Sequence, residues 1–158
     1  MEVLLAQVAA ALQAKGWLLT TAESCTGGWI AKLCTDLVGS SVWFERGFVT
    51  YSNEAKQEML GVPVPTLAEH GAVSEAVTAA MATGALLHSR AQVAVSVSGI
   101  AGPGGGTTTK PVGMVCFGWA AQDGTVRTAT QYFDGDREAV RYQAVQYALH
   151  GVLQILAD

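Results

Sequence analysis

Hydrophobic and polar positions along the chain follow two repeats in turn. Apolar residues that recur every three or four positions predict helices, and short runs of β-branched and aromatic residues predict strands. We therefore expect helices near residues 3–15, 28–37, 53–60, 74–88 and 136–156. We expect strands near residues 17–22, 42–51, 92–98, 112–121 and 125–133. Residues 66–72 form a loop or a short helix on this pattern.

Local signals at the ends of these segments agree with the periodicity. Gly16 follows the first helix as a C-cap, and Ser52 or Asn53 suits the N-cap of the third. Gly47 interrupts an aromatic strand, which indicates a bulge or a close backbone approach. The Gln122-Asp123-Gly124 turn predicts a hairpin between the last two strands.

The order of these elements predicts the fold class. Helices and strands alternate in the first half, which implies crossover connections, and the hairpin adds an antiparallel pair. We expect an α/β fold with three α/β/α layers and a mixed sheet. The 158 residues suit a single domain spanning 1–158, and we find no internal repeat or linker.

Composition and charge exclude several classes of protein. Half of the residues are hydrophobic, which is enough for a core without disulfides or metal. The net charge of −4 argues against a nucleic-acid footprint, which needs a basic face. The cysteines and histidines lack zinc-site spacing, so we expect no metal: Cys25, Cys34, Cys116, His70, His88 and His150.

Nothing in the chain predicts a membrane segment or a secretion signal. The longest apolar run, residues 112–121, is too short to cross a bilayer, and the first residues lack a basic region and a cleavage pattern. We expect a soluble cytoplasmic protein with free thiols and no membrane partner.

The strongest candidate site is Thr21-Ala22-Glu23-Ser24-Cys25-Thr26-Gly27-Gly28, between a predicted strand and a predicted helix. The first amide groups of a helix have no intrahelical partner and can stabilise an oxyanion. A nucleophile could therefore be Ser24, Cys25 or Thr26. The alternative is a plain N-cap followed by a glycine turn.

A candidate base follows the second predicted strand. Lys56 lies in the first turn of a helix, where the dipole and partial burial would lower its pKa toward neutrality. A neutral lysine can accept the proton of a serine, and Tyr51 could hydrogen-bond either partner. The alternative is an ordinary surface lysine. No histidine lies where a general base is expected.

Two further stretches suit a phosphate-bearing ligand. The glycine-rich loop 99–113 follows a strand, and its amide groups could face an anion, although it matches neither a P-loop nor a dinucleotide-binding motif. Arg137 and Arg141 lie on one face at the start of the last helix and could bind phosphate. An exposed flexible loop and a solvated helix face are the alternatives.

Taken together, these stretches resemble the nicotinamide-nucleotide amidase family, the C-terminal domain of competence/damage-inducible CinA proteins, in its stand-alone form. Four blocks match in order: residues 21–28, Tyr51-Ser52-Asn53-Glu54-Ala55-Lys56, residues 99–107 with 110–113, and residues 133–137 with Arg141. The similarity spans residues 3–156. It implies a CinA C-terminal-domain-like fold and a role in pyridine nucleotide salvage.

The resemblance also implies an activity and its residues. The expected reaction is hydrolysis of the carboxamide of nicotinamide mononucleotide to nicotinate mononucleotide and ammonia, without a cofactor. Ser24 corresponds to the nucleophile, Lys56 to the base and Tyr51 to an assisting residue. Amide groups between Cys25 and Gly28 would hold the oxyanion. The residues expected to bind substrate are Thr26, Gly27, Gly102, Gly105, Gly106, Thr107, Arg137 and Arg141.

Several alternatives remain open at this point. Many family members carry an additional N-terminal domain with nucleotide pyrophosphatase activity, and we expect this chain to be the amidase part alone. The chain could bind a nucleotide without turnover, or could act as a thiol hydrolase through Cys25. Apolar residues of the last helix and Trp43-Phe44, together with the family, favour a homodimer.

Overall fold

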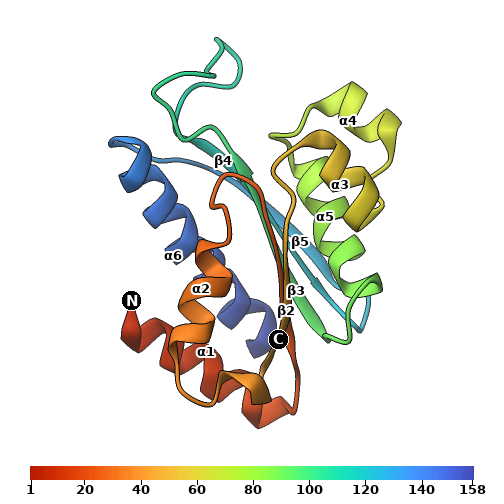
Figure 1. Ribbon diagram of the computed structural model, residues 1–158, viewed down its shortest axis with the longest axis vertical. Helices are drawn as coiled ribbons and strands as arrows, with labels where there is room; N and C mark the ends of the chain where they lie inside the picture. The colour runs from red at the N-terminus through yellow and green to blue at the C-terminus, as the bar shows by residue number, and fades with distance from the viewer.

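A five-stranded sheet forms the centre of the molecule, with three helices on each face (Figure 1). The computed structural model describes residues 1–158. The strands are β1 (Leu19–Glu23), β2 (Phe44–Val49), β3 (Val93–Gly99), β4 (Met114–Ala121) and β5 (Val126–Tyr132). The helices are α1 (Glu2–Lys15), α2 (Trp29–Asp36), α3 (Asn53–Leu60), α4 (Val64–His70), α5 (Glu75–Leu87) and α6 (Arg137–Ala157). This arrangement confirms the three-layer α/β/α fold with a mixed sheet.

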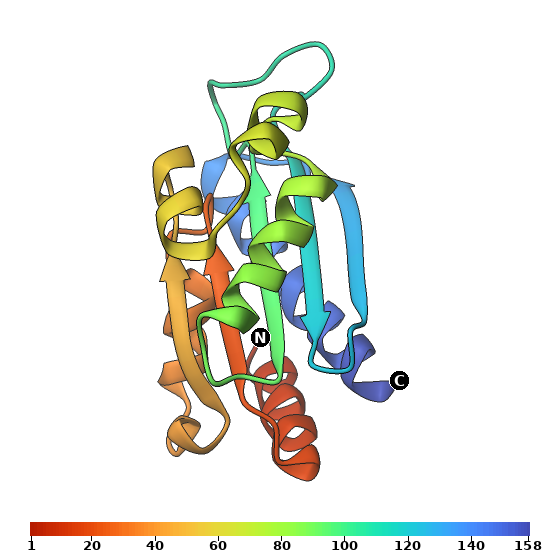
Figure 2. The ribbon, with the colours of Figure 1, turned by 90° about the vertical axis from the view of Figure 1, so that its right-hand side faces the viewer.

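The strand order is β2-β1-β3-β4-β5, which mixes parallel and antiparallel pairs (Figure 2). β1 pairs in parallel with β2 on one side and with β3 on the other. β4 runs antiparallel to β3, and β5 runs antiparallel to β4. The carboxyl ends of β1, β2 and β3 therefore meet at one edge of the sheet, where ligands bind in open α/β folds.

Two hydrophobic clusters pack on opposite faces of the sheet. The larger holds α1, α2 and α6, and the smaller holds the layer of α3, α4 and α5. Trp43 is 2% exposed and lies in the larger cluster, as does the apolar stripe of α6. These residues are buried within one chain, so they no longer argue for a dimer.

Most sequence-based boundaries hold to within a few residues. Gly47 is a site of close approach, since a Cβ there would meet the Thr21 hydroxyl at 2.7 Å. The predicted strand 42–51 is shorter than expected, because residues 40–42 form a 3₁₀ turn before β2. Residues 66–72, for which the sequence allows a loop or a short helix, lie mainly in helix α4, which has a proline near its start. No helix combines the length and hydrophobicity that crossing a bilayer requires.

Candidate active site

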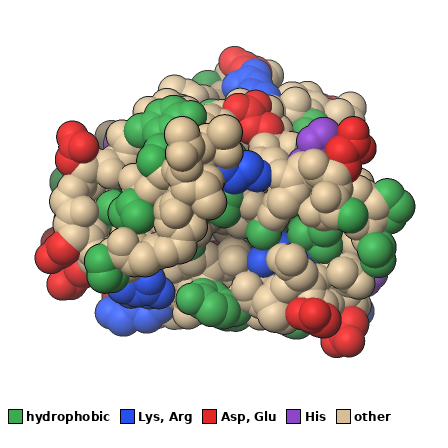
Figure 3. All heavy atoms as spheres, turned by 90° about the horizontal axis from the view of Figure 1, so that it is seen from above, with side chains coloured by type: hydrophobic (Ala, Val, Ile, Leu, Met, Phe, Trp, Pro, Cys, Tyr) green, Lys and Arg blue, Asp and Glu red, His purple; other side chains and the backbone are tan.

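A cavity of about 250 Å³ opens at the carboxyl ends of the three parallel strands. Viewed from that end, the surface is hollowed near its centre, with Lys or Arg side chains beside the hollow (Figure 3). The lining includes residues that follow each of the three strands, as expected where parallel strands end. The lining residues are Ser24, Cys25, Tyr51, Asn53, Lys56, Ala72, Val73, Ser98, Gly99, Ala101 and Arg137.

Ser24 and Lys56 form a hydrogen-bonded pair in the wall of this cavity. The Ser24 Oγ lies 3.0 Å from the Lys56 Nζ, and the two residues are 8% and 1% exposed. The same Nζ donates to the carbonyl oxygen of Thr50 at 2.9 Å and lies 3.4 Å from that of Tyr51. The fold thus joins two residues that are 32 positions apart in the chain.

The surroundings of Lys56 favour its neutral form. Burial lowers the pKa of its ammonium below the usual 10.5, and no carboxylate hydrogen-bonds it. A neutral amine has two hydrogens and one lone pair. The two carbonyl oxygens can accept the two hydrogens, which leaves the lone pair to accept the Ser24 hydroxyl proton. The partners of Lys56 therefore match the requirements of a general base for serine.

The turn that carries Ser24 is held by Glu23, whose side chain sequence reasoning did not single out. Its carboxylate accepts hydrogen bonds from the Thr26 hydroxyl at 2.7 Å and from the amides of Ile30 and Ala31 at 2.8 and 3.1 Å. Burial raises the pKa of Glu23, although these hydrogen bonds oppose the shift. The carboxylate occupies the start of α2, so those amides are not available to an oxyanion.

Few amide groups near Ser24 remain free. The Gly27 amide donates to the Ser24 carbonyl at 3.0 Å, and the Trp29 amide donates to the Thr26 carbonyl at 3.0 Å. The amides of Cys25 and Thr26 donate to no protein acceptor. Two adjacent donors directly after Ser24 suit an oxyanion hole. The Gly27 amide is occupied and the Gly28 amide hydrogen-bonds the Glu23 carboxylate, so the predicted range, Cys25 to Gly28, narrows to the amides of Cys25 and Thr26.

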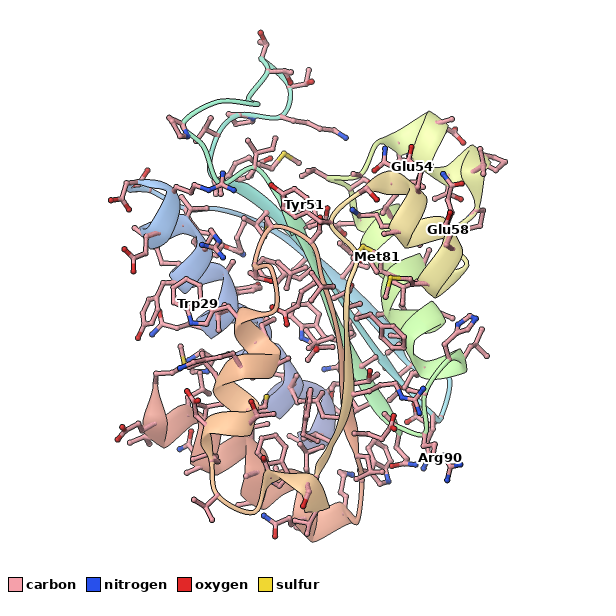
Figure 4. The ribbon with its side chains drawn as sticks, in the orientation of Figure 1. Trp29, Tyr51, Glu54, Glu58, Met81 and Arg90 are labelled. Atoms are coloured by element: carbon pink, nitrogen blue, oxygen red, sulfur yellow. The ribbon has the colours of Figure 1, made fainter.

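Tyr51 borders the cavity, and its side chain makes no hydrogen bond with Ser24 or Lys56. The residue is 64% exposed, and its hydroxyl makes no hydrogen bond within the protein. Figure 4 shows Tyr51 at the end of the sheet, below the loop that joins β3 to β4. Its contact with Lys56 is made by the main-chain carbonyl. The assisting role of the phenol stays a prediction.

The Cys25 thiol has the properties of a buried cysteine rather than of an activated nucleophile. Burial raises its pKa to about 12, so the thiol stays protonated at neutral pH. It is 7% exposed and hydrogen-bonds no side-chain base. The structure therefore favours Ser24 over Cys25 as the nucleophile.

Only one of the predicted substrate-binding residues, Arg137, lines the cavity. Arg137 lines it and donates from Nη1 to the Gly102 carbonyl at 2.9 Å. Arg141 instead donates to the Cys25 carbonyl at 2.9 Å and to the Thr26 carbonyl at 3.2 Å. The remaining predicted residues do not line the cavity: Thr26, Gly27, Gly102, Gly105, Gly106 and Thr107.

Several lining residues were not predicted individually. Ser98 is the next-to-last residue of β3 and is 1% exposed, and Asn53 begins α3. Ala72 and Val73 come from the α4–α5 connection. The sequence contained one usable signal for Ser98, because this polar residue lies at the end of a predicted strand whose other residues are mainly valine and alanine. That β3 lies directly beside β1 is known only from the structure.

No group of three or more His, Cys, Asp or Glu side chains lies close enough to hold a metal ion. The hydrogen-bonded pair offers a different chemistry, the transfer of a proton from Ser24 to Lys56 and attack by the serine oxygen. Acyl transfer is the reaction class that uses a serine, a base and adjacent amide donors.

Comparison with known proteins gives concordant results. The model of the CinA C-terminal domain family matches residues 1–156. "Nicotinamide-nucleotide amidohydrolase PncC" of Enterobacter agglomerans is 62% identical over 94% of this chain and 90% of its own length. The protein of the same name from Escherichia coli (strain K12) is 61% identical over the same shares. The crystal structure of competence/damage inducible protein CihA from Agrobacterium tumefaciens has a TM-score of 0.95 at 46% identity, covering 99% of this chain and 95% of that one.

Proposed function

The chain belongs to the CinA C-terminal domain family and is a nicotinamide-nucleotide amidohydrolase, and we propose that it hydrolyses the carboxamide of nicotinamide mononucleotide through Ser24 and Lys56. The observation that carries the proposed mechanism is the buried hydrogen bond between the Ser24 Oγ and the Lys56 Nζ. Burial penalises the charged form of a lysine. A structural role therefore does not explain why Lys56 is buried in the cavity wall without a carboxylate partner.

The proposed reaction has two halves. Lys56 removes the hydroxyl proton while the Ser24 oxygen attacks the carboxamide carbon, and the amides of Cys25 and Thr26 stabilise the oxyanion. The protonated Lys56 then gives its proton to the departing nitrogen, which releases ammonia and leaves a serine ester. Water attacks the ester with Lys56 again acting as base, and nicotinate mononucleotide leaves. Tyr51 assists at the cavity mouth in this proposal.

The size and charge of the cavities suit a nucleotide. The active-site cavity of about 250 Å³ is large enough for a nicotinamide ring, and a second cavity of about 510 Å³ adjoins it. The two share Ala101 and Arg137. We expect the ring beside Ser24, the ribose toward the second cavity, and the phosphate at the Arg137 guanidinium.

Three expectations from the sequence analysis accompany this proposal. The chain acts as a single domain in the cytoplasm, and its resemblance to the family, rather than its buried residues, favours a homodimer. Light scattering of the purified protein tests the last of these, and a monomer mass at assay concentrations would contradict it.

An acyl-enzyme can be detected by diverting it. With nicotinamide mononucleotide, the protein should release ammonia and nicotinate mononucleotide in equal amounts. Hydroxylamine competes with water for an ester and should convert part of the product to the hydroxamic acid. Ammonia release with no hydroxamic acid at any hydroxylamine concentration would indicate direct attack by water and would exclude the serine ester.

A further inference from the structure

Arg141 makes contacts that differ from those of a substrate-binding arginine. It reaches from the first turns of α6 to the turn after the nucleophile, more than 100 positions earlier in the chain. Its Nε donates to the Cys25 carbonyl at 2.9 Å and its Nη2 donates to the Thr26 carbonyl at 3.2 Å. Two donors of one planar guanidinium thus hold two successive carbonyl oxygens.

These contacts fix the orientation of the peptide groups next to Ser24. In a trans peptide the carbonyl and the following amide point in opposite directions. Because Arg141 binds the Cys25 carbonyl, it directs the Thr26 amide to the other side of that peptide plane. The preceding plane is fixed separately, since the Gly27 amide binds the Ser24 carbonyl. The two amides left without acceptors, those of Cys25 and Thr26, belong to these two planes.

Other contacts hold the Arg141 side chain in place. Its guanidinium carbon lies 5.3 Å from the centre of the Trp29 ring, within the range of a cation–π interaction. Trp29 in turn packs against Tyr142, with ring centres 5.8 Å apart. Figure 4 shows Trp29 at the junction of α2 and α6. An arginine oriented by a ring and two carbonyls has little freedom to follow a ligand.

The position of Arg141 also argues against a direct role in phosphate binding. Arg141 lines neither the active-site cavity nor the adjoining one, whereas Arg137 lines both. A phosphate that took Arg141 would have to remove its bonds to two carbonyl oxygens.

We propose that Arg141 is a positioning residue that orients the Cys25–Thr26 peptide plane, so that the Thr26 amide faces the oxyanion of the reaction beside the Cys25 amide. This inference rests on the proposed function. It assigns the two arginines of the last helix to different tasks: Arg137 acts on the substrate and Arg141 acts through the main chain of the nucleophile turn.

Steady-state kinetics with nicotinamide mononucleotide separate the two tasks. Loss of an oriented oxyanion donor lowers kcat by about 10²-fold, so Arg141→Gln should lose about that factor with KM changed less than threefold. Arg141→Lys keeps the charge but cannot bridge both carbonyls, and we expect an intermediate loss. Arg137→Gln should instead raise KM. Arg90→Gln, an exposed arginine at the opposite end of the molecule from Tyr51 (Figure 4), is the control and should match wild type.

Binding without turnover provides a second readout. In a Ser24→Ala background, Arg141→Gln should leave the Kd for nicotinamide mononucleotide within threefold, because the oxyanion does not form. A Kd raised tenfold or more, or kinetics in which Arg141→Gln changes KM alone, would overturn the proposal and return Arg141 to substrate binding. Melting temperatures of all variants establish that each is folded at the assay temperature.

A third readout does not depend on the substrate. A fluorophosphonate reacts with activated serines, and its phosphoryl oxygen uses the same amide donors. Wild type should be labelled at Ser24, and Arg141→Gln should be labelled about 10²-fold more slowly. Equal labelling rates would overturn the role of Arg141 alone. A wild type that reacts with neither the probe nor nicotinamide mononucleotide would overturn the proposed function, and the role of Arg141 with it.

Discussion

At the scale of single residues, the site depends on the environment of each side chain more than on its type. In the proposed mechanism Lys56 acts as the base and Ser24 as the nucleophile, because burial disfavours the ammonium and the fold places the Lys56 Nζ 3.0 Å from the Ser24 Oγ. The pKa of Cys25, the neighbour of Ser24, shifts in the opposite direction, because burial raises it and keeps the thiol protonated. Burial therefore favours the neutral amine of Lys56, which can accept a proton, and the neutral thiol of Cys25, which is a poor nucleophile.

The state of Lys56 predicts a pH dependence. The amine accepts a proton only when it is neutral, which is above its pKa, and burial lowers that pKa from 10.5. We expect kcat/KM to rise with pH and to reach a plateau below pH 10.5. Lys56→Met should abolish turnover across the range. A rate that falls as pH increases over this limb, or a midpoint at or above 10.5, would contradict a neutral lysine base.

Sequence could identify these residues but not their partners. Ser24 and Lys56 stand out because each follows a predicted strand at the start of a helix. The task of Arg141 could not be predicted, because it depends on contacts with carbonyl oxygens more than 100 positions away. Glu23 was missed because its hydrogen-bond donors, the amides of Ile30 and Ala31, face its carboxylate only when α2 is placed beside β1.

At the scale of helices and strands, local signals and long-range packing act separately. Ser52, Ser74 and Asp136 accept amide hydrogen bonds at the starts of α3, α5 and α6, as their positions in the sequence indicate. The start of β2 was predicted too early, because an aromatic run favours a strand wherever it falls, whereas residues 40–42 form a 3₁₀ turn. Caps are local and therefore readable, while strand ends depend on neighbours.

Helix α5 offers a test of the packing that supports the site. Gly84 lies in its interior, where alanine would stabilise an isolated helix by about 1 kcal/mol. A Cβ at this position would meet the main-chain carbonyl of Leu60 at the end of α3, the helix that carries Lys56. We expect Gly84→Ala to destabilise the protein by about 2 kcal/mol in urea unfolding, because overpacking outweighs propensity. Thr83→Ala, exposed on the same helix, is the matched control and should be neutral or slightly stabilising. A more stable Gly84→Ala variant would contradict this packing.

At the scale of the whole molecule, the site forms where both hydrophobic layers meet the carboxyl end of the sheet. β2 pairs with one side of β1, and β3 pairs with the other side. The strand order therefore reverses at β1, the strand that Ser24 follows. Lys56 comes from the layer of α3, whereas Arg141 comes from α6 on the opposite face. The alternation of elements was enough to predict three layers, but the strand order that joins these residues was not available from sequence.

The most direct test of the account is ammonia release from nicotinamide mononucleotide by wild type, Ser24→Ala and Cys25→Ala, measured side by side. We predict turnover by wild type, a loss of at least about 10³-fold in Ser24→Ala, and activity retained within about tenfold in Cys25→Ala. Equal activity of Ser24→Ala and wild type, or loss confined to Cys25→Ala, would contradict the serine–lysine mechanism.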